Sequence, residues 1–177
     1  MRKRTIAKNI ITGLLLGWGA LLPARAADNM TFRGALVAEP CVIPPGQETV
    51  VLNFGSVVDK YLYQNLRSPG VQFEIILAEC DLSVGKTVRM TLNGTESLAL
   101  PGLLAPSSQA GGIAIGLETP EGQMVPINHS GEKFILADGT NGIRLLAYVR
   151  GEPEAIANRT IGRGTFSAAA TFSLEYE

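Results

Sequence analysis

The sequence predicts an all-β domain, built as a sandwich or a barrel. Apolar residues recur at every second position in several short stretches, as expected for strands with one buried face. Clusters of Gly, Pro, Ser and Asn separate these stretches, as turns separate antiparallel strands. Strands do not alternate with helices, and no long amphipathic helix is evident, so we do not expect an α/β architecture.

The first residues have the pattern of an export signal. Four basic residues precede the apolar run Ile10–Leu22, which is too short to span a bilayer comfortably. Ala24 and Ala26 occupy the two small-residue positions of a cleavage site. We expect residues 1–26 to be a signal peptide cleaved after Ala26; an uncleaved membrane anchor is the alternative.

Cleavage would remove 26 of the 177 residues and leave 151, which is enough for one domain with a sizeable core. The remaining part keeps 10 of the 15 basic residues and all 16 acidic ones, a net charge of −6. Because phosphate binding requires clustered Lys and Arg, we expect no nucleic-acid partner.

The first alternating stretch has an interruption. Met30, Phe32, Leu36 and Ala38 share one face, and Gly34 stands at the position between Phe32 and Leu36. The stretch either pairs with its own domain as an edge strand or is donated to another molecule. A missing side chain permits close approach of another backbone, which favours donation.

The remaining elements follow in order along the chain. We expect strands where apolar residues alternate, and a single helical turn at Glu152–Asn158. The predicted strands are Thr49–Gly55, Val71–Leu77, Thr87–Gly94, Ile113–Leu117, Ile143–Val149 and Phe166–Glu177. The last stretch places small residues between large ones on one face: Phe166, Ala168, Ala170, Phe172, Leu174 and Tyr176.

Cys41 and Cys80 are the two cysteines of an exported chain, and we expect them to form a disulfide. The bridge would close a loop of about 40 residues and contribute about 4 kcal/mol. A redox or metal site is disfavoured, because there is no C-x-x-C motif and His129 is the only histidine.

The motifs that suggest catalysis are incomplete. Gly85-Lys86-Thr87 resembles the end of a phosphate-binding loop, but Cys80 occupies the position of the required glycine, and a strand pattern follows instead of a helix. The S-x-x-K motif at Ser83 lacks its partner motifs. We therefore interpret this segment as a turn.

The remaining polar residues indicate no active site. The one histidine, His129, lies in a predicted loop, which disfavours a catalytic triad or a multi-histidine metal site. The carboxylates that flank turns are expected to be solvated; they are Glu118, Glu121, Glu132 and Asp138. We expect no enzyme activity, no metal and no cofactor, although an enzyme on a β-sandwich is an alternative.

Several pieces, in order along the chain, resemble subunits of chaperone–usher pili, in particular the minor tip and adaptor subunits of P-type pili. Gly164 also matches, since it precedes an alternating strand with penultimate Tyr176. The other matching pieces are "DNMTFRG", Cys41, "VVLNFGSV", "FEIILAEC", "GTESLALPG" and "GIAIGLETPEG".

This resemblance implies an incomplete immunoglobulin-like β-sandwich, a pilin fold that lacks its last strand. Residues 27–40 would form an N-terminal donor-strand extension, and residues 41–177 the pilin domain. A periplasmic chaperone would lend the missing strand, and at the outer-membrane usher a neighbouring subunit's extension would replace it. The resemblance assigns Phe32, Gly34, Leu36 and Ala38 to the donor strand.

It also assigns Gly164 and the alternating face Phe166 to Tyr176 to the strand that lines the groove and pairs with the chaperone. The expected protein is a structural minor or adaptor subunit that reaches the cell surface in the fimbrium and contributes to cell adhesion. A carbohydrate-binding sandwich, either a lectin or a tip adhesin, is the alternative. It is disfavoured because 151 residues leave no room for a separate receptor domain, and the only tryptophan, Trp18, lies in the signal peptide.

Overall fold

The computed structural model describes Gly34, Leu36 and residues 38–177. The predicted signal peptide and Phe32 lie outside the described residues. The chain divides into two compact units, residues 1–36 and residues 37–177. All the helices and strands described below belong to the second unit.

One sheet contains β1 (Val71–Cys80), β6 (Gly139–Gly151) and β4 (Ile113–Glu118), in the antiparallel order β1-β6-β4. Ile75 pairs with Ile143, and Ile115 pairs with Val149, so the apolar faces of the three strands coincide. All three strands were predicted from their alternation, which sets one face of the sheet toward the core.

The second sheet contains β5 (Lys133–Ile135), β2 (Thr87–Gly94) and β8 (Ala170–Tyr176), in the order β5-β2-β8. A two-stranded pair joins β3 (Ser107–Ser108) to β7 (Phe166–Ser167). The predicted strand Phe166–Glu177 is therefore interrupted at Ala168 and Ala169, because the chain changes its partner there from β3 to β2.

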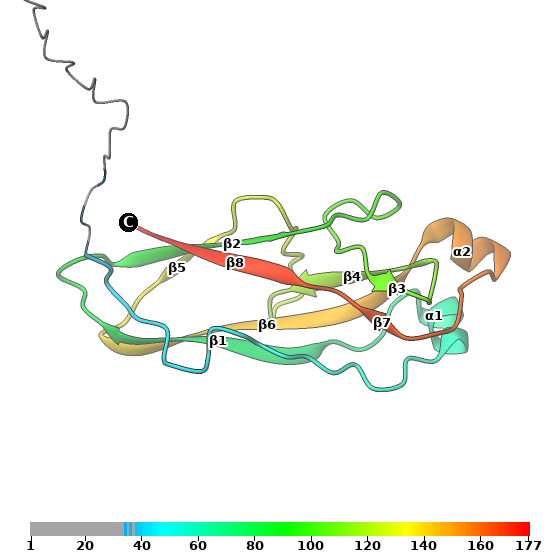
Figure 1. The fold of residues 1–177 in the computed structure, drawn as a ribbon, viewed down its shortest axis with the longest axis horizontal. Coiled ribbons are helices and arrows are strands. Elements are labelled where there is room, and N and C mark those ends of the chain that lie inside the picture. Colours follow the sequence, from blue (N-terminus) through cyan, green and yellow to red (C-terminus); the bar gives the residue numbers. More distant parts are fainter. Residues whose placement is uncertain (1–33, 35, 37) are drawn as a thin grey trace, which may run out of the picture. The chain divides into compact units, whose positions relative to one another are not determined.

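The two sheets enclose one apolar core (Figure 1). Large side chains of β8 pack against its margin and are only half-buried. Most buried residues of this core come from β1, β2, β4 and β6, and include Ile75, Leu77, Val88, Met90, Ile115, Leu117, Ile143 and Leu145. This facing of two antiparallel sheets confirms the expected β-sandwich.

Two short helices lie at one end of this unit, opposite Glu177 (Figure 1). α2 (Pro153–Asn158) forms where a helical turn was predicted, with a proline in its first turn. α1 (Asp59–Asn65) was not predicted, because Leu62 is its only buried residue and seven residues are too few to show a helical period.

A disulfide joins Cys41 to Cys80, as predicted. Next to it, Val42 and Ala78 exchange two backbone hydrogen bonds of 2.9 and 2.8 Å. The chain therefore enters the domain attached to the end of β1. Within the part of the chain that the structure describes, no helix is long and apolar enough to cross a membrane.

Candidate functional site

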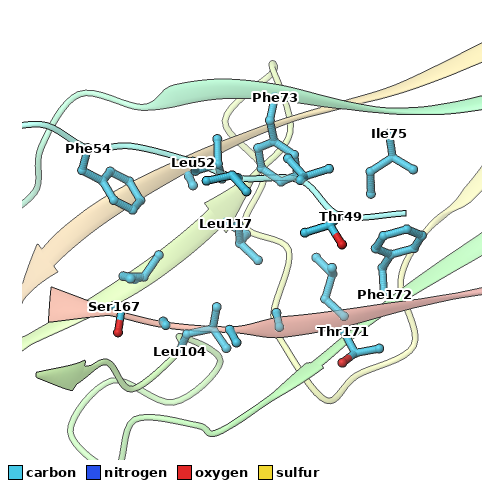
Figure 2. Close-up of a pocket in the computed structure, with 18 of the residues that line it drawn as sticks. Thr49, Leu52, Phe54, Phe73, Ile75, Leu104, Leu117, Ser167, Thr171 and Phe172 are labelled. Carbon is cyan, nitrogen blue, oxygen red and sulfur yellow. The ribbon is translucent and has the colours of Figure 1, made fainter. Parts of the chain in front are cut away.

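A long apolar groove runs along β7 and β8, with a cavity volume of about 790 Å³. The segment from Glu48 to Phe54 forms one wall, and the segment from Phe166 to Phe172 forms the other. Figure 2 shows Leu52 and Phe54 on one side of this space and Ser167, Thr171 and Phe172 on the other.

The first wall has the burial pattern of a strand but no strand partner. Leu52 and Phe54 are half-buried, whereas Asn53 between them is exposed, and Val51 before them is 87% exposed. Among the described residues, the backbone from Thr49 to Phe54 makes no ladder hydrogen bond. The prediction of a strand at Thr49–Gly55 is therefore wrong, because this segment is not hydrogen-bonded to another strand of the described region. Alternating apolar residues in a sequence indicate which side chains are buried, but they do not indicate whether the backbone has a hydrogen-bonded partner.

The second wall is paired on one edge only. β8 is hydrogen-bonded to β2, with Phe172 opposite Leu92 and Leu174 opposite Met90. No strand of the described region pairs with its other edge. Ala168 and Ala170 are exposed on this wall, and their small side chains leave the space above the floor unfilled.

The floor of the groove consists of core side chains from both sheets. Leu92 and Leu104 are buried, as are Ile115 and Leu117 of β4, and Phe73 of β1 also lines the space. An apolar floor between two unpaired backbone edges has the geometry that accepts an added β-strand, through main-chain hydrogen bonds and alternating apolar side chains.

The described residues of the predicted donor strand are exposed. Gly34, Leu36 and Ala38 lie in no strand, and the Leu36 side chain is fully exposed. Pro40, by contrast, is buried, and its carbonyl accepts a 2.8 Å hydrogen bond from the Asp81 N–H. The chain is therefore attached to the β-sandwich at Pro40.

A second pocket, of about 250 Å³, lies beyond the Phe166 end of the groove. Phe166 lines both spaces and packs against Phe54, with ring centroids 5.9 Å apart. Gly164, which was predicted as a site residue, lines this second pocket. Its backbone φ angle is +155°, and a Cβ added there would lie 2.9 Å from the Cβ of Gln109. No pattern in the sequence indicates this pocket, because α1, which forms part of its wall, shows no helical period in the sequence.

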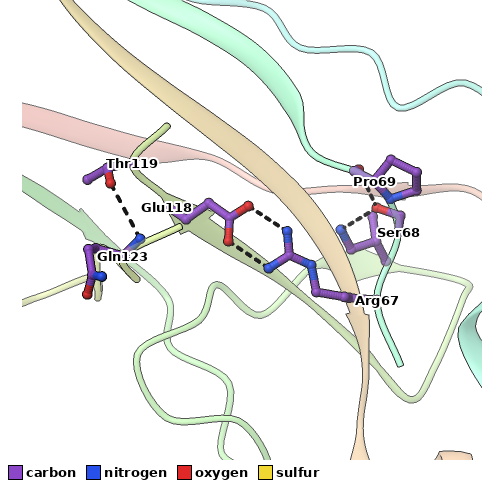
Figure 3. A network of polar contacts seen from close by, with 7 residues as sticks. Arg67, Ser68, Pro69, Glu118, Thr119 and Gln123 are labelled. Carbon is purple, nitrogen blue, oxygen red and sulfur yellow. Dashed lines mark hydrogen bonds and ion pairs between the residues drawn. The ribbon is translucent and has the colours of Figure 1, made fainter. Parts of the chain in front are cut away.

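Glu118 was expected to be solvated, and that expectation is wrong. Its carboxylate accepts two hydrogen bonds from the Arg67 guanidinium, at 2.6 and 2.5 Å, and its side chain is 10% exposed (Figure 3). Arg67 also stacks on the Tyr148 ring at 3.8 Å. The hydrogen bonds from Arg67 lower the pKa of Glu118.

The other polar residues considered above lie as predicted. Glu121, Glu132 and Asp138 are exposed, and His129 lies exposed in a turn. The described residues contain no group of three or more acidic, histidine or cysteine side chains arranged to hold a metal. Residues 81–86 form turns between β1 and β2 and no helix, which confirms the interpretation of the phosphate-loop-like motif.

Comparisons with known proteins agree with this fold. The family described as "Fimbrial protein" matches residues 30–177. Fimbria A protein of Serratia marcescens is 31% identical, over 95% of this chain and 97% of its own length. Fimbrial adapter PapK of Escherichia coli is 32% identical, over 93% and 97%. Putative minor fimbrial subunit PmfF of Proteus mirabilis is 30% identical, over 99% and 100%.

Among solved structures, the P pilus rod subunit PapA superposes with a TM-score of 0.69 at 24% identity, over 78% of this chain and all of that one. A subunit from a chaperone–usher pilus structure superposes with a TM-score of 0.67 at 24% identity, over 86% and 97%. These two likenesses show a shared fold, the incomplete immunoglobulin-like sandwich.

Proposed function

This chain belongs to the fimbrial protein family, and from that premise we infer that it is a structural minor or adaptor subunit of a chaperone–usher pilus. The observation that supports this function most directly is the apolar groove, which has an unpaired backbone edge on each side. The subunit is exported through the periplasm and resides in the fimbrium at the cell surface. Its partners are the periplasmic chaperone, the outer-membrane usher and neighbouring subunits.

We propose that the groove receives a donor strand between Thr49–Phe54 and β8. The free backbone edges supply hydrogen bonds, and the floor receives alternate apolar side chains. In this proposal, the face from Phe166 to Tyr176 pairs first with the chaperone and then with a neighbouring subunit. An uncovered apolar groove promotes aggregation, so one strand must replace another without leaving the groove empty.

We propose that the extension, residues 27–40, is the strand that this subunit donates to a neighbour. Phe32, Gly34, Leu36 and Ala38 would face that neighbour's groove. The family match begins at residue 30 and so includes residues 30–40 of this segment, which supports a role in the family's function. The role is structural rather than enzymatic and contributes to cell adhesion. The relatives are fimbrial subunits, which favours this role over the carbohydrate-binding alternative.

The proposal is tested with the synthetic peptide Asp28–Glu39 and subunit–chaperone complexes from the same pilus. We expect the peptide to displace the chaperone from at least one complex, as measured by native gel electrophoresis and mass spectrometry. A scrambled peptide of the same composition is the control. If the native peptide leaves the chaperone bound in every complex, the extension is not a donor strand.

A second test concerns the glycine of the donor strand. We expect Gly34→Leu to block incorporation into fibres while the domain still folds, because a Cβ added at Gly34 would meet no atom within 4 Å. Fibre incorporation is measured by immunogold labelling, and folding by circular dichroism of the chaperone complex. Thr31→Val is a matched control, because Thr31 alternates with Met30 and Phe32 and is predicted to lie on the opposite face of the strand. Normal incorporation of the Gly34→Leu variant would contradict close packing around the donor strand.

A further inference from the structure

The sequence contains two Asn-Gly pairs, and one of them, Asn93-Gly94, ends the strand β2 that pairs with β8. We propose that Asn93 is a site of spontaneous deamidation and that the side chain of Asn128 suppresses the reaction there. The chemistry is independent of the proposed function of the groove. Its consequence rests on that function, because Asn93 and Gly94 pair with Thr171 and Ala170 of the groove wall.

An Asn-Gly pair is chemically labile because glycine has no side chain to shield its backbone nitrogen. The Gly94 nitrogen attacks Cγ of Asn93, and the new N–C bond closes a five-membered succinimide. The amide group of Asn93 takes up the proton of the Gly94 nitrogen and leaves as ammonia. Water then opens the ring and yields aspartate or isoaspartate. Asn93 is exposed, so water reaches its carboxamide.

The attacking nitrogen is held in place by Asn128. The Gly94 N–H donates a 3.0 Å hydrogen bond to Oδ1 of Asn128, and Nδ2 of Asn128 donates at 3.0 Å to the Gly94 carbonyl. An N–H that is bonded to Oδ1 retains its proton and points away from Cγ of Asn93. These two hydrogen bonds therefore oppose the first step of deamidation.

Asn128 takes the place of a strand neighbour at this end of β2. At the start of β2, the partner is β5, which pairs with Thr87–Arg89. At its end, the Asn128 N–H donates at 2.7 Å to the Leu92 carbonyl, and its side chain pairs with Gly94. Alternate residues of a strand direct their N–H and C=O groups to the same edge, so one residue serves both.

The identity of residue 128 suits this arrangement. Its backbone has φ +60°, a left-handed conformation that asparagine adopts more readily than most residues. Its carboxamide carries a donor and an acceptor, so it imitates a peptide group toward Gly94.

The labile glycine cannot be exchanged without disturbing the groove. A Cβ added at Gly94 would overlap Cδ2 of Leu104, a buried residue of the groove floor, and would lie 3.2 Å from the Ala169 carbonyl oxygen. This close approach requires glycine, so protection must come from outside the pair. Isoaspartate at position 93 would lengthen the backbone by one methylene and displace Gly94 from Ala170.

The test follows deamidation in the subunit–chaperone complex at mildly alkaline pH, by peptide mass spectrometry at intervals. Asn128→Gly removes the carboxamide and keeps the left-handed backbone accessible. In this variant, we expect modification of Asn93 to proceed at least about tenfold faster than in the natural chain, because two hydrogen bonds are lost. Asn128→Asp, which still offers an acceptor to the Gly94 N–H, should be modified more slowly than Asn128→Gly.

The chain offers a matched control in its second pair, Asn141-Gly142. The Asn141 side chain accepts a 2.7 Å hydrogen bond from the Ala137 N–H and donates at 2.8 Å to its carbonyl, and Gly142 pairs with Ile76. None of these contacts involves Asn128, so the rate at Asn141 should be the same in both chains. In the Asn93→Gln, Asn128→Gly double variant, the acceleration at position 93 should disappear.

Equal rates at Asn93 in the natural chain and in Asn128→Gly would overturn the inference. An equal acceleration at Asn141 would also overturn it, because it would indicate general unfolding. The consequence is measured with the same samples: donor-peptide binding by Asn128→Gly should fall as isoaspartate accumulates at position 93. If the fresh natural subunit exchanges its chaperone for no peptide, the groove proposal fails, whereas the two deamidation rates still test the role of Asn128.

Discussion

At the scale of single residues, the most informative side chain is Glu118. It is the last residue of the buried strand β4 and precedes the turn at Thr119, a position that usually holds a solvated carboxylate. It is instead covered by Arg67, which lies 51 residues earlier in the chain and donates hydrogen bonds to its carboxylate. The pair makes bidentate hydrogen bonds and the guanidinium stacks on Tyr148, so both charges are satisfied at the edge of the core.

We expect Glu118→Gln to lower the free energy of unfolding by about 1–3 kcal/mol, because it leaves a partly buried guanidinium with a weaker partner. The measurement is urea denaturation of the peptide-complemented domain. Glu74→Gln, which breaks an exposed ion pair, is the control and should cost no more than about 1 kcal/mol. Equal effects of the two substitutions would contradict a special role for the Arg67–Glu118 pair.

The same pair predicts a pH dependence of stability. Arg67 lowers the pKa of Glu118 in the folded state below the ordinary value of 4.5, so its contribution is present above pH 4.5 and is lost as the pH falls through the folded-state pKa. The difference in stability between the natural domain and Glu118→Gln should therefore shrink between pH 5 and pH 2. A difference that stays constant over this range would exclude the linkage.

At the scale of elements, the groove walls behave differently from the other strands. β1, β4 and β6 exchange hydrogen bonds with strands of the same domain, whereas Thr49–Phe54 makes no ladder bond within the described residues. β8 is paired on one edge and free on the other. Local stability should follow this difference, because amides without a partner exchange with solvent readily.

We therefore expect amide hydrogen exchange in Thr49–Phe54 and Ala168–Thr171 to slow by at least about tenfold when a donor peptide fills the groove. Exchange is measured by mass spectrometry on the refolded chain with and without the peptide. Ile143–Ala147 in β6, which is already paired with β1, serves as the internal reference. Equal protection of both groove walls before and after peptide addition would show that the groove does not accept a strand.

At the scale of the whole molecule, stability depends on both the disulfide and a strand supplied by a partner. Cys41 follows the buried Pro40, and the bridge attaches this point to Cys80 at the end of β1. An incomplete sandwich buries less apolar surface than a complete one, so the covalent link supplies a larger share of a marginal stability.

We expect the Cys41→Ser, Cys80→Ser double variant to lose about 4 kcal/mol of unfolding free energy in the peptide-complemented domain, as loop-closure entropy predicts. The urea midpoint should fall accordingly, and periplasmic yield should fall with it. The natural domain treated with dithiothreitol should reach the same lower midpoint, which controls for the serine side chains. A midpoint equal to that of the oxidised natural domain would show that the bridge adds no stability.

The amino-acid sequence by itself determined the all-β class, the positions of the four strands β1, β2, β4 and β6, the helical turn at α2 and the Cys41–Cys80 pairing. These features depend on local alternation, turn chemistry and an even cysteine pair. It also identified both the glycine-interrupted first stretch and the strand from Phe166 to Tyr176, through their alternation and the family resemblance.

Only the tertiary structure decided which predicted strands are paired, because alternation measures burial of one face and carries no information on backbone partners. It divided the last strand where the chain changes partner, and left Thr49–Phe54 without a ladder. It also brought Arg67 to Glu118, and Arg163 to Asp59. The residues in these two contacts are separated by 51 and 104 positions in the sequence, and a local sequence pattern cannot predict contacts over such separations.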